Sequence, residues 1–252
     1  MKLLFTADLH GYDRAYSDFA QALKNSFALG VLGGDLMTYP SDEELKLAKR
    51  QLESENLEIA DLKGANNPHV VERALRNKEN YYKRILHNSD KPVLFVMGND
   101  DGILGSGSGW LAENSIVDIN QRRAMWGKYS FVGYHYTSPF VGGAFEKSEA
   151  EQARDFATLI KFMNDNTVLI THGPPWGILD TTFGGKHAGS KALRDLIEKR
   201  PPLVHLFGHI HQSFGIQGIF VNGAYPGSRK FISVDLENRK IAVVEQGSSN
   251  HR

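Results

Sequence analysis

Residues of the types that bind metal ions stand in five short motifs between positions 8 and 211. Asp-x-His, Gly-Asp, Gly-Asn, Thr-His-Gly and Gly-His-Ile-His follow one another in that order. The candidate ligands are Asp8, His10, Asp35, Asn99, His172, His209 and His211. A set that mixes oxygen and imidazole ligands suits Mn, Fe, Zn, Co or Ni better than Ca or Mg alone. The set is large enough for two metal ions if one carboxylate bridges them.

The spacing within two of these motifs favours a shared ion. Asp8 and His10 are two residues apart, as are His209 and His211. In an extended segment, residues i and i+2 point to the same side, so each pair of side chains can meet one metal. A single Asp-x-His is more often a polar turn. The metal prediction therefore depends on all five motifs together.

Each motif follows a short apolar run that is typical of a buried strand. The runs cover residues 2–7, 28–34, 91–98, 167–171 and 203–208. Ligands of α/β sheets bind at the carboxyl ends of the strands, and all five motifs occupy that position. We therefore expect the metal-binding residues to converge at one edge of the protein.

Helical patterns lie between these runs, which predicts an α/β fold. Apolar residues recur at helical spacing over 16–27 and 153–163. Ser41 and Glu44 form the signature of a capping box at the start of a helix, and Ser190 can cap another helix that ends at Lys199. Two segments, 115–136 and 219–246, have the pattern of β-hairpins. We predict a two-sheet α/β sandwich with a helical insertion at about 41–90.

We expect residues 1–246 to form a single domain and residues 247–252 to be a frayed tail. The glycine- and serine-rich stretch at 102–109 predicts a flexible loop bordering the site. It lacks the Gly-x-Gly-x-x-Gly spacing of a dinucleotide-binding loop.

The composition excludes several classes of protein. The chain has 252 residues, 29 Lys and Arg against 29 Asp and Glu, and no cysteine. Without cysteine there is no disulfide, no thiolate zinc site and no cysteine nucleophile. Zero net charge argues against a nucleic-acid partner. No run is long enough for a membrane span or a signal-peptide core, so we predict a cytoplasmic protein with no membrane partner.

The five motifs, in this order, resemble those of the calcineurin-like metallophosphoesterase superfamily, and they span most of the chain. The stretch from His187 through Ser190, followed by Gly-His-Ile-His, looks most like the small prokaryotic branch of that superfamily. The resemblance implies a two-sheet sandwich with a dinuclear site of divalent metals, for which we favour Mn. It also implies that one metal is held by Asp8, His10 and His211, the other by Asn99, His172 and His209, with Asp35 bridging.

One position departs from the family pattern. Many members carry a His after the Gly-Asn, which helps to protonate the leaving oxygen, and here that residue is Asp100. Asp100 is therefore a catalytic candidate: a carboxylate could serve as the acid if its pKa were raised, but beside two cations it should stay ionised. Either the leaving group must then be good or another group donates the proton. Asp101, the next residue, is better suited to orienting the site from outside the ligand set.

His187 is the candidate replacement for the absent acid. It follows a glycine-rich stretch and precedes a helix start, so it could contact the phosphoryl group or the leaving oxygen. The alternative is a histidine in a surface loop.

We therefore predict a metal-dependent phosphoric ester hydrolase. A hydroxide bridging two metals would attack a small phosphodiester or an activated phosphomonoester. The alternative is a catalytically weakened, metal-containing interaction module on the same scaffold, which intact ligands beside an altered acid would also fit.

Overall fold

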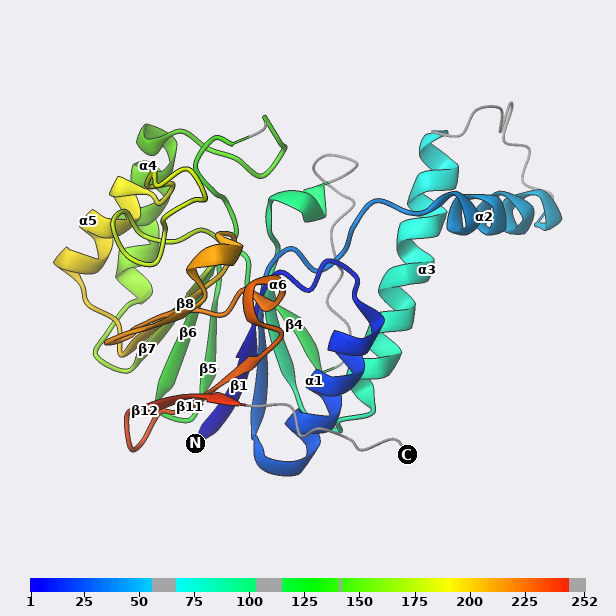
Figure 1. The fold of residues 1–252 in the computed structure, drawn as a ribbon. Coiled ribbons are helices and arrows are strands. Elements are labelled where there is room, and N and C mark those ends of the chain that lie inside the picture. Colours follow the sequence, from blue (N-terminus) through cyan, green and yellow to red (C-terminus); the bar gives the residue numbers. More distant parts are fainter. Residues whose placement is uncertain (56–66, 103–114, 141, 245–252) are drawn as a thin grey trace.

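Two six-stranded sheets pack face to face with helices on their outer sides (Figure 1). This arrangement comes from a computed structural model, which describes residues 1–55, 67–102, 115–140 and 142–244. It confirms the two-sheet α/β sandwich predicted from the sequence.

Both sheets have a parallel centre; the second sheet is antiparallel at both margins, and the first only at the margin formed by β11 and β12. The first sheet, in spatial order, consists of β12 (Lys240–Val244), β11 (Phe231–Asp235), β1 (Lys2–Thr6), β2 (Leu29–Gly33), β3 (Val93–Val96) and β4 (Ile116–Asp118). The second consists of β5 (Arg123–Trp126), β6 (Tyr129–Tyr134), β7 (Thr167–Thr171), β8 (Val204–Phe207), β10 (Phe220–Asn222) and β9 (Gly215–Gln217). All five predicted strands are present, as β1, β2, β3, β7 and β8.

Side chains of the central strands are buried on both faces. In β1, Leu3 and Phe5 pack between the sheets, whereas Leu4 packs on the helical side. This alternation follows from the two-residue period of a strand. Because helices or the other sheet cover each face, the central strands are almost continuously apolar.

The helices of the described chain are α1 (Asp13–Ser26), α2 (Asp42–Ser54), α3 (Pro68–His87), α4 (Glu149–Leu159), α5 (Lys191–Lys199) and the short α6 (Tyr225–Ser228), and the 3₁₀ turns are η1 (Asn99–Gly102), η2 (Ile160–Phe162) and η3 (His211–Ser213). Helices α1 and α3 cover the outer face of the first sheet, α4 and α5 cover that of the second, and α2 packs on α3 (Figure 1). Helices α1, α2 and α3 share a core with the first sheet, and α4 and α5 share one with the second.

The helix starts agree with the capping residues in the sequence. Ser41 and Glu44 form both hydrogen bonds of a capping box at α2, and the Ser190 hydroxyl accepts from the Leu193 amide at α5. Helices α2 and α3 are the helices predicted within 41–90.

The predicted hairpin over 115–136 is only partly correct. The antiparallel hairpin is β5–β6, whereas β4 pairs in parallel with β3 in the other sheet. The chain crosses between the sheets after Ile119, whose amide donates to the Phe95 carbonyl. Gly133 permits this crossing, because a Cβ there would collide with the Ile119 carbonyl. The second predicted hairpin is confirmed as β11–β12.

Some predictions lie outside the described residues. These are most of the loop at 102–109 and the tail at 247–252. The extent of the domain, 1–246, stays a prediction. Within the described part of the chain, no helix combines the length and the apolar character needed to cross a membrane.

The packing between the sheets predicts a large effect of one truncation. Phe131 on β6 is fully buried in this layer. We expect Phe131→Ala to lower the free energy of unfolding by about 3–5 kcal/mol, because it removes buried apolar area and leaves a cavity. Urea unfolding measures this change. Phe183→Ala, at a side chain that is 94% exposed, is the control and should leave stability within about 0.5 kcal/mol of wild type.

Candidate metal centre

The seven predicted ligands all lie at the carboxyl end of a central strand. They follow β1 (Asp8 and His10), β2 (Asp35), β3 (Asn99), β7 (His172) and β8 (His209 and His211). The first three strands are from one sheet and the last two are from the other, so the site forms where the two sheets meet.

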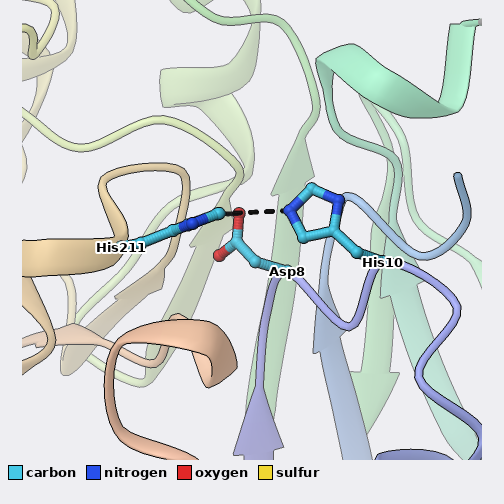
Figure 2. Close-up of side chains that lie close together, drawn as sticks. All are labelled: Asp8, His10 and His211. Atoms are coloured by element: carbon cyan, nitrogen blue, oxygen red, sulfur yellow. Dashed lines mark hydrogen bonds and ion pairs between the residues drawn. The ribbon is translucent and has the colours of Figure 1, made fainter.

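The first group joins the loop after β1 to the loop after β8. Asp8, His10 and His211 each offer a ligand atom, and these atoms lie within 4.8 Å of one another. The two imidazole Nε2 atoms are 3.2 Å apart, and His211 Nε2 is 3.5 Å from Asp8 Oδ1. Figure 2 shows the two rings directed toward each other beside the Asp8 carboxylate.

The second group joins β2, β3, β7 and β8. Asp35, His172 and His209 place ligand atoms within 4.8 Å of one another. His172 Nε2 is 3.2 Å from Asp35 Oδ2 and 3.1 Å from Asn99 Oδ1. Asn99 therefore joins this group through its carbonyl oxygen.

Asp35 lies between the two groups. Its Oδ2 atom is 3.2 Å from His172 Nε2 and 3.9 Å from His10 Nε2. Its Oδ1 atom accepts from the Asp100 amide at 2.9 Å. One carboxylate thus faces a histidine of each group, which is the placement that a bridging ligand requires.

The hydrogen bonds of His172 show that this donor set fits a cation. Its Nδ1 atom lies 2.9 Å from the Gly33 carbonyl, which can only accept, so Nδ1 carries the proton. In the neutral ring, Nε2 then presents a lone pair toward Asp35 and Asn99, whose facing atoms are also acceptors. Three acceptors converge on one point, and a positive charge there removes their repulsion.

The same electrostatics sets the pKa values in the metal-free protein. Burial opposes a charge on His172, but the neighbouring Asp35 carboxylate outweighs burial and raises the pKa of His172 to about 10. Burial would raise the pKa of Asp35, yet the nearby His172 and His10 hold it below its ordinary value. Burial and His172 together lower the pKa of His209 to about 4. A proton on His172 thus occupies the place that a metal ion would take.

Four of the candidate ligands have left-handed backbone conformations. The φ angles are 57° at Asp8, 43° at His10, 49° at Asp35 and 69° at His209. Residues other than glycine rarely adopt such angles, and each costs about 1–2 kcal/mol. The strain persists because the strands and the hydrogen bonds of the loops hold it, and it directs these side chains into one space.

Two glycines leave room for the ligands to approach one another. A Cβ at Gly98 would collide with the Asp35 carboxylate, and a Cβ at Gly208 would collide with the Asp8 carboxylate. The Gly-Asn and Gly-His motifs therefore carry glycine because the backbone of one loop touches the ligand of another.

Asp101 holds the loops after β2 and β3 together. Its buried carboxylate accepts from the backbone amides of Leu36, Met37 and Gly98 at 2.9–3.1 Å. Burial and the charge of Asp35 raise the pKa of Asp101 to about 7. The predicted role of Asp101 as an orienting residue agrees with these contacts.

Five of the seven candidate ligands line an open cavity of about 370 Å³. The described residues that line it, in chain order, are His10, Asp35, Asn99, Asp100, Phe140, Thr182, Phe183, Gly184, His209, Ile210, His211 and Gln212. They include two exposed aromatic rings, Phe140 and Phe183. This volume suits a small molecule.

A family model described as calcineurin-like phosphoesterase matches residues 1–213. The chain belongs to the calcineurin-like phosphoesterase family. This membership implies metal-dependent hydrolysis of phosphoesters, and the predicted resemblance is confirmed.

Curated relatives match shorter stretches of this chain. UPF0046 protein K07C11.7 of Caenorhabditis elegans is 31% identical over 125 residues, which are 48% of this chain and 42% of that protein. The human metallophosphoesterase domain-containing protein 1 is 41% identical over 51 residues, which are 19% of this chain and 16% of that protein. The matched stretches thus span less than half the length of these relatives.

Solved structures share the fold over nearly the whole chain. One crystal structure has a TM-score of 0.71 at 17% identity and covers 97% of this chain and 98% of its own. The crystal structure of TT1561 from Thermus thermophilus has a TM-score of 0.60 at 15% identity, with the same coverage. At such identities the likeness shows the fold alone.

The structure gives His187 a partner that the sequence did not indicate. Its Nδ1 atom lies 2.7 Å from Oδ1 of the buried Asp180, and its ring packs beside Trp176. His187 is not among the described residues that line the metal-site cavity, although Thr182 and Phe183 of the same loop are. Its predicted contact with the phosphoryl group stays a prediction.

Sequence reasoning missed the two phenylalanines of the cavity and Asp180. Phe140 follows a Ser-Pro pair and Phe183 precedes two glycines. Exposed aromatic residues in loops after strands are a usable signal for a site, but their direction depends on loop geometry that no periodicity encodes.

The raised pKa of His172 predicts how the metal-free phosphoesterase responds to alkali. A histidine titrates near 6.5 when unfolded, so this residue contributes stability that is fully present below pH 6.5 and lost as the pH rises through about 10. We expect the urea midpoint of the metal-free protein to fall as the pH rises from about 7 to about 9.5.

His172→Gln should remove the part of this fall in the urea midpoint with pH that comes from the titration of His172. The buried histidines His135 and His205 do not interfere, because their pKa values are lowered to about 4 and about 3 and affect stability only below about pH 6.5. Equal pH slopes for the variant and the wild type would contradict this assignment.

Proposed function

We propose that this chain is a dinuclear metal phosphoesterase that hydrolyses small phosphodiesters or phosphomonoesters with good leaving groups. Asp8, His10 and His211 would hold one metal ion, Asn99, His172 and His209 the other, and Asp35 would bridge them. Family membership supports phosphoester hydrolysis, and the substrate class and the pair of metals are our proposal.

The observation that carries this proposal is the position of Asp35. Its carboxylate faces His10 of one group and His172 of the other, at 3.9 and 3.2 Å. A site for a single ion would not need ligand sets on both sides of one carboxylate.

The metal ions would supply Lewis acidity and a nucleophile near neutral pH, since two such ions lower the pKa of bound water. The residues of the chain place those ions and the ester. Gly33 fixes the His172 tautomer, and the His209 amide donates to both oxygens of Asp8 at 3.0 Å. These contacts hold the ligands before any substrate arrives.

The cavity favours a small ester with modest charge. Its described lining contains no lysine or arginine, so little beyond the metal ligands attracts a polyanion. Phe140 and Phe183 offer apolar surface to the organic part of the ester.

Asp100 is better placed to orient a ligand than to donate a proton. Its Oδ2 atom is 3.5 Å from His10 Nδ1, and its Oδ1 atom accepts from Asn99 Nδ2 at 2.8 Å. A carboxylate on the outer nitrogen of a histidine sets the tautomer and directs the other nitrogen at a metal. We propose that Asp100 positions His10 and Asn99.

With Asp100 in that role, the described lining of the cavity lacks a general acid. Thr182 and Gln212, which also line it, do not titrate near neutral pH. The departing oxygen must then leave without a proton, which restricts the enzyme to good leaving groups.

Removal of the bridge should empty the site. We expect Asp35→Asn to lose bound metal and to lower turnover of bis(p-nitrophenyl) phosphate by at least ~10²-fold, because a neutral amide cannot balance two cations. Elemental analysis of the remetallated wild type should find two metal ions per chain, and one or fewer would contradict the dinuclear assignment. Asp165→Asn, at an exposed carboxylate, is the control and should behave as wild type.

The leaving group should control the rate. A general acid is worth ~10²–10⁴-fold, so its absence makes alkyl esters much slower than nitrophenyl esters of the same phosphate. A series of aryl and alkyl esters with graded leaving-group pKa values measures this dependence. Equal kcat values across the series would mean that an acid is present.

Asp100→Asn separates the two roles of that residue. If Asp100 positions His10, the variant should weaken metal binding by about 10–100-fold. The dependence of log kcat on the leaving-group pKa across the ester series should then keep its wild-type slope. If Asp100 is the acid, metal content should stay at wild-type level and the slope should steepen.

The same ester series tests His187. As an acid, it should make His187→Ala slower on alkyl esters by ~10²–10⁴-fold, with nitrophenyl esters and metal content unaffected. The exposed His69 provides the control variant, His69→Ala. Wild-type rates on both ester classes would leave His187 as a loop residue held by Asp180.

The alternative function, a metal-containing interaction module, has its own signature. It predicts two bound metals with no hydrolysis of any ester in the series. The strained backbone of the ligands favours the enzyme, because such strain is typical of sites that perform chemistry.

A further inference from the structure

A second cavity of about 450 Å³ lies between the start of α1 and α6. It is lined by Tyr12, Arg14, Ala15, Tyr225, Pro226 and Arg229. We call it the arginine pocket. It has the volume of an ordinary small-molecule site. None of the motifs that built the metal centre contributes a residue to it.

The arginine pocket is separate from the metal-site cavity but joined to the same loops. The two cavities share no lining residue. Tyr12 follows His10 by two residues, and the Tyr225 amide donates to the Ala7 carbonyl, next to Asp8. Figure 1 shows α6 beside the loop that leads from β1 to α1.

Two guanidinium groups give the arginine pocket positive charge. Within the described part of the chain, the Arg229 side chain forms no hydrogen bond or ion pair. Arg14 Nε is 3.5 Å from Asp18 Oδ2, a surface pair that is worth little. The Asp13 carboxylate is bonded to the Tyr82 hydroxyl at 3.0 Å and does not line the pocket. Guanidinium donors are therefore available to an acid group of a ligand.

The left-handed backbone at Arg229 makes this residue suitable for a glycine substitution. This residue ends α6 with φ 56°, a left-handed position that glycine occupies at lower energy. An arginine there is strained, so its replacement by glycine removes the side chain without straining the backbone. Arg239, in the turn between β11 and β12, has nearly the same φ of 51° and does not line the pocket.

Tyr12 supplies an exposed aromatic ring next to this charge, and Tyr225, which is buried, lines the pocket beside it. Tyr12 is 55% exposed and its ring is 6.5 Å from the ring of Tyr225. An exposed ring beside guanidinium groups offers a planar ligand both stacking surface and charge.

We propose that the arginine pocket binds a small aromatic organic anion, with the acid group held by Arg229 and Arg14 and the ring against Tyr12. This binding needs no metal. It therefore stands or falls independently of the proposed hydrolysis.

The test uses naphthalene-2-sulfonate as the probe, because a sulfonate bonds to guanidinium groups and is a poor ligand for metal ions. Titration calorimetry on the manganese-loaded protein should show one site. Arg229→Gln should weaken binding at least about tenfold, since it removes hydrogen bonds between ionised partners. Arg14→Gln should weaken it less, because the Arg14 side chain is 82% exposed and water competes for its hydrogen bonds.

Matched controls separate the pocket from general surface charge. Arg239→Gln should bind the probe as the wild type does. Arg229→Gly and Arg239→Gly should both raise the urea midpoint by relieving a left-handed residue, and only the former should lose the probe. These glycine variants also show that loss of binding is not loss of folding.

Three results would overturn the proposal. The first is that Arg229→Gln binds the probe as tightly as the wild type does. The second is that the uncharged 2-naphthalenemethanol binds as tightly as the sulfonate. The third is that the probe no longer binds after EDTA has removed the metals. The last would show that binding of the probe depends on the metals.

Discussion

The burial of three carboxylates at the strand ends is the constraint on which this structure depends. Asp8, Asp35 and Asp101 are almost completely enclosed where the two sheets meet. Buried carboxylates are costly unless hydrogen bonds and opposite charge compensate them. Backbone amides of neighbouring loops meet all three, and histidines face the first two. The loops must therefore take the conformations that deliver these amides, and the site follows from that requirement.

The buried carboxylates need hydrogen bonds from backbone amides, and this need explains the unusual backbone of the site. Left-handed angles at four candidate ligands, together with Gly98 and Gly208, bring separate loops closer than ordinary residues allow. Such strain is stable only on a rigid support, and the parallel centres of both sheets provide it. A protein of this kind combines a stiff core with a site whose geometry already suits a cation.

Charge divides the surface around the strand ends into two chemical environments. The metal-site cavity joins carboxylates and imidazoles to two phenylalanines, whereas the arginine pocket joins guanidinium groups to tyrosines. Both depend on the loop after β1, which carries His10 toward one cavity and Tyr12 toward the other. One short loop from a single strand end thus serves two different surfaces.

The sequence by itself determined the strands, the helix caps and the metal-binding residue types, because these depend on local period, capping chemistry and strand ends. It did not determine which sheet takes β4, since that depends on the approach of Ile119 to the distant Gly133. Nor did it indicate that Asp180 holds His187, that Asp100 contacts His10, or that Arg229 shares a pocket with Tyr12. Contacts between loops distant in sequence have no period to reveal them, and only the packing of the two sheets decided them.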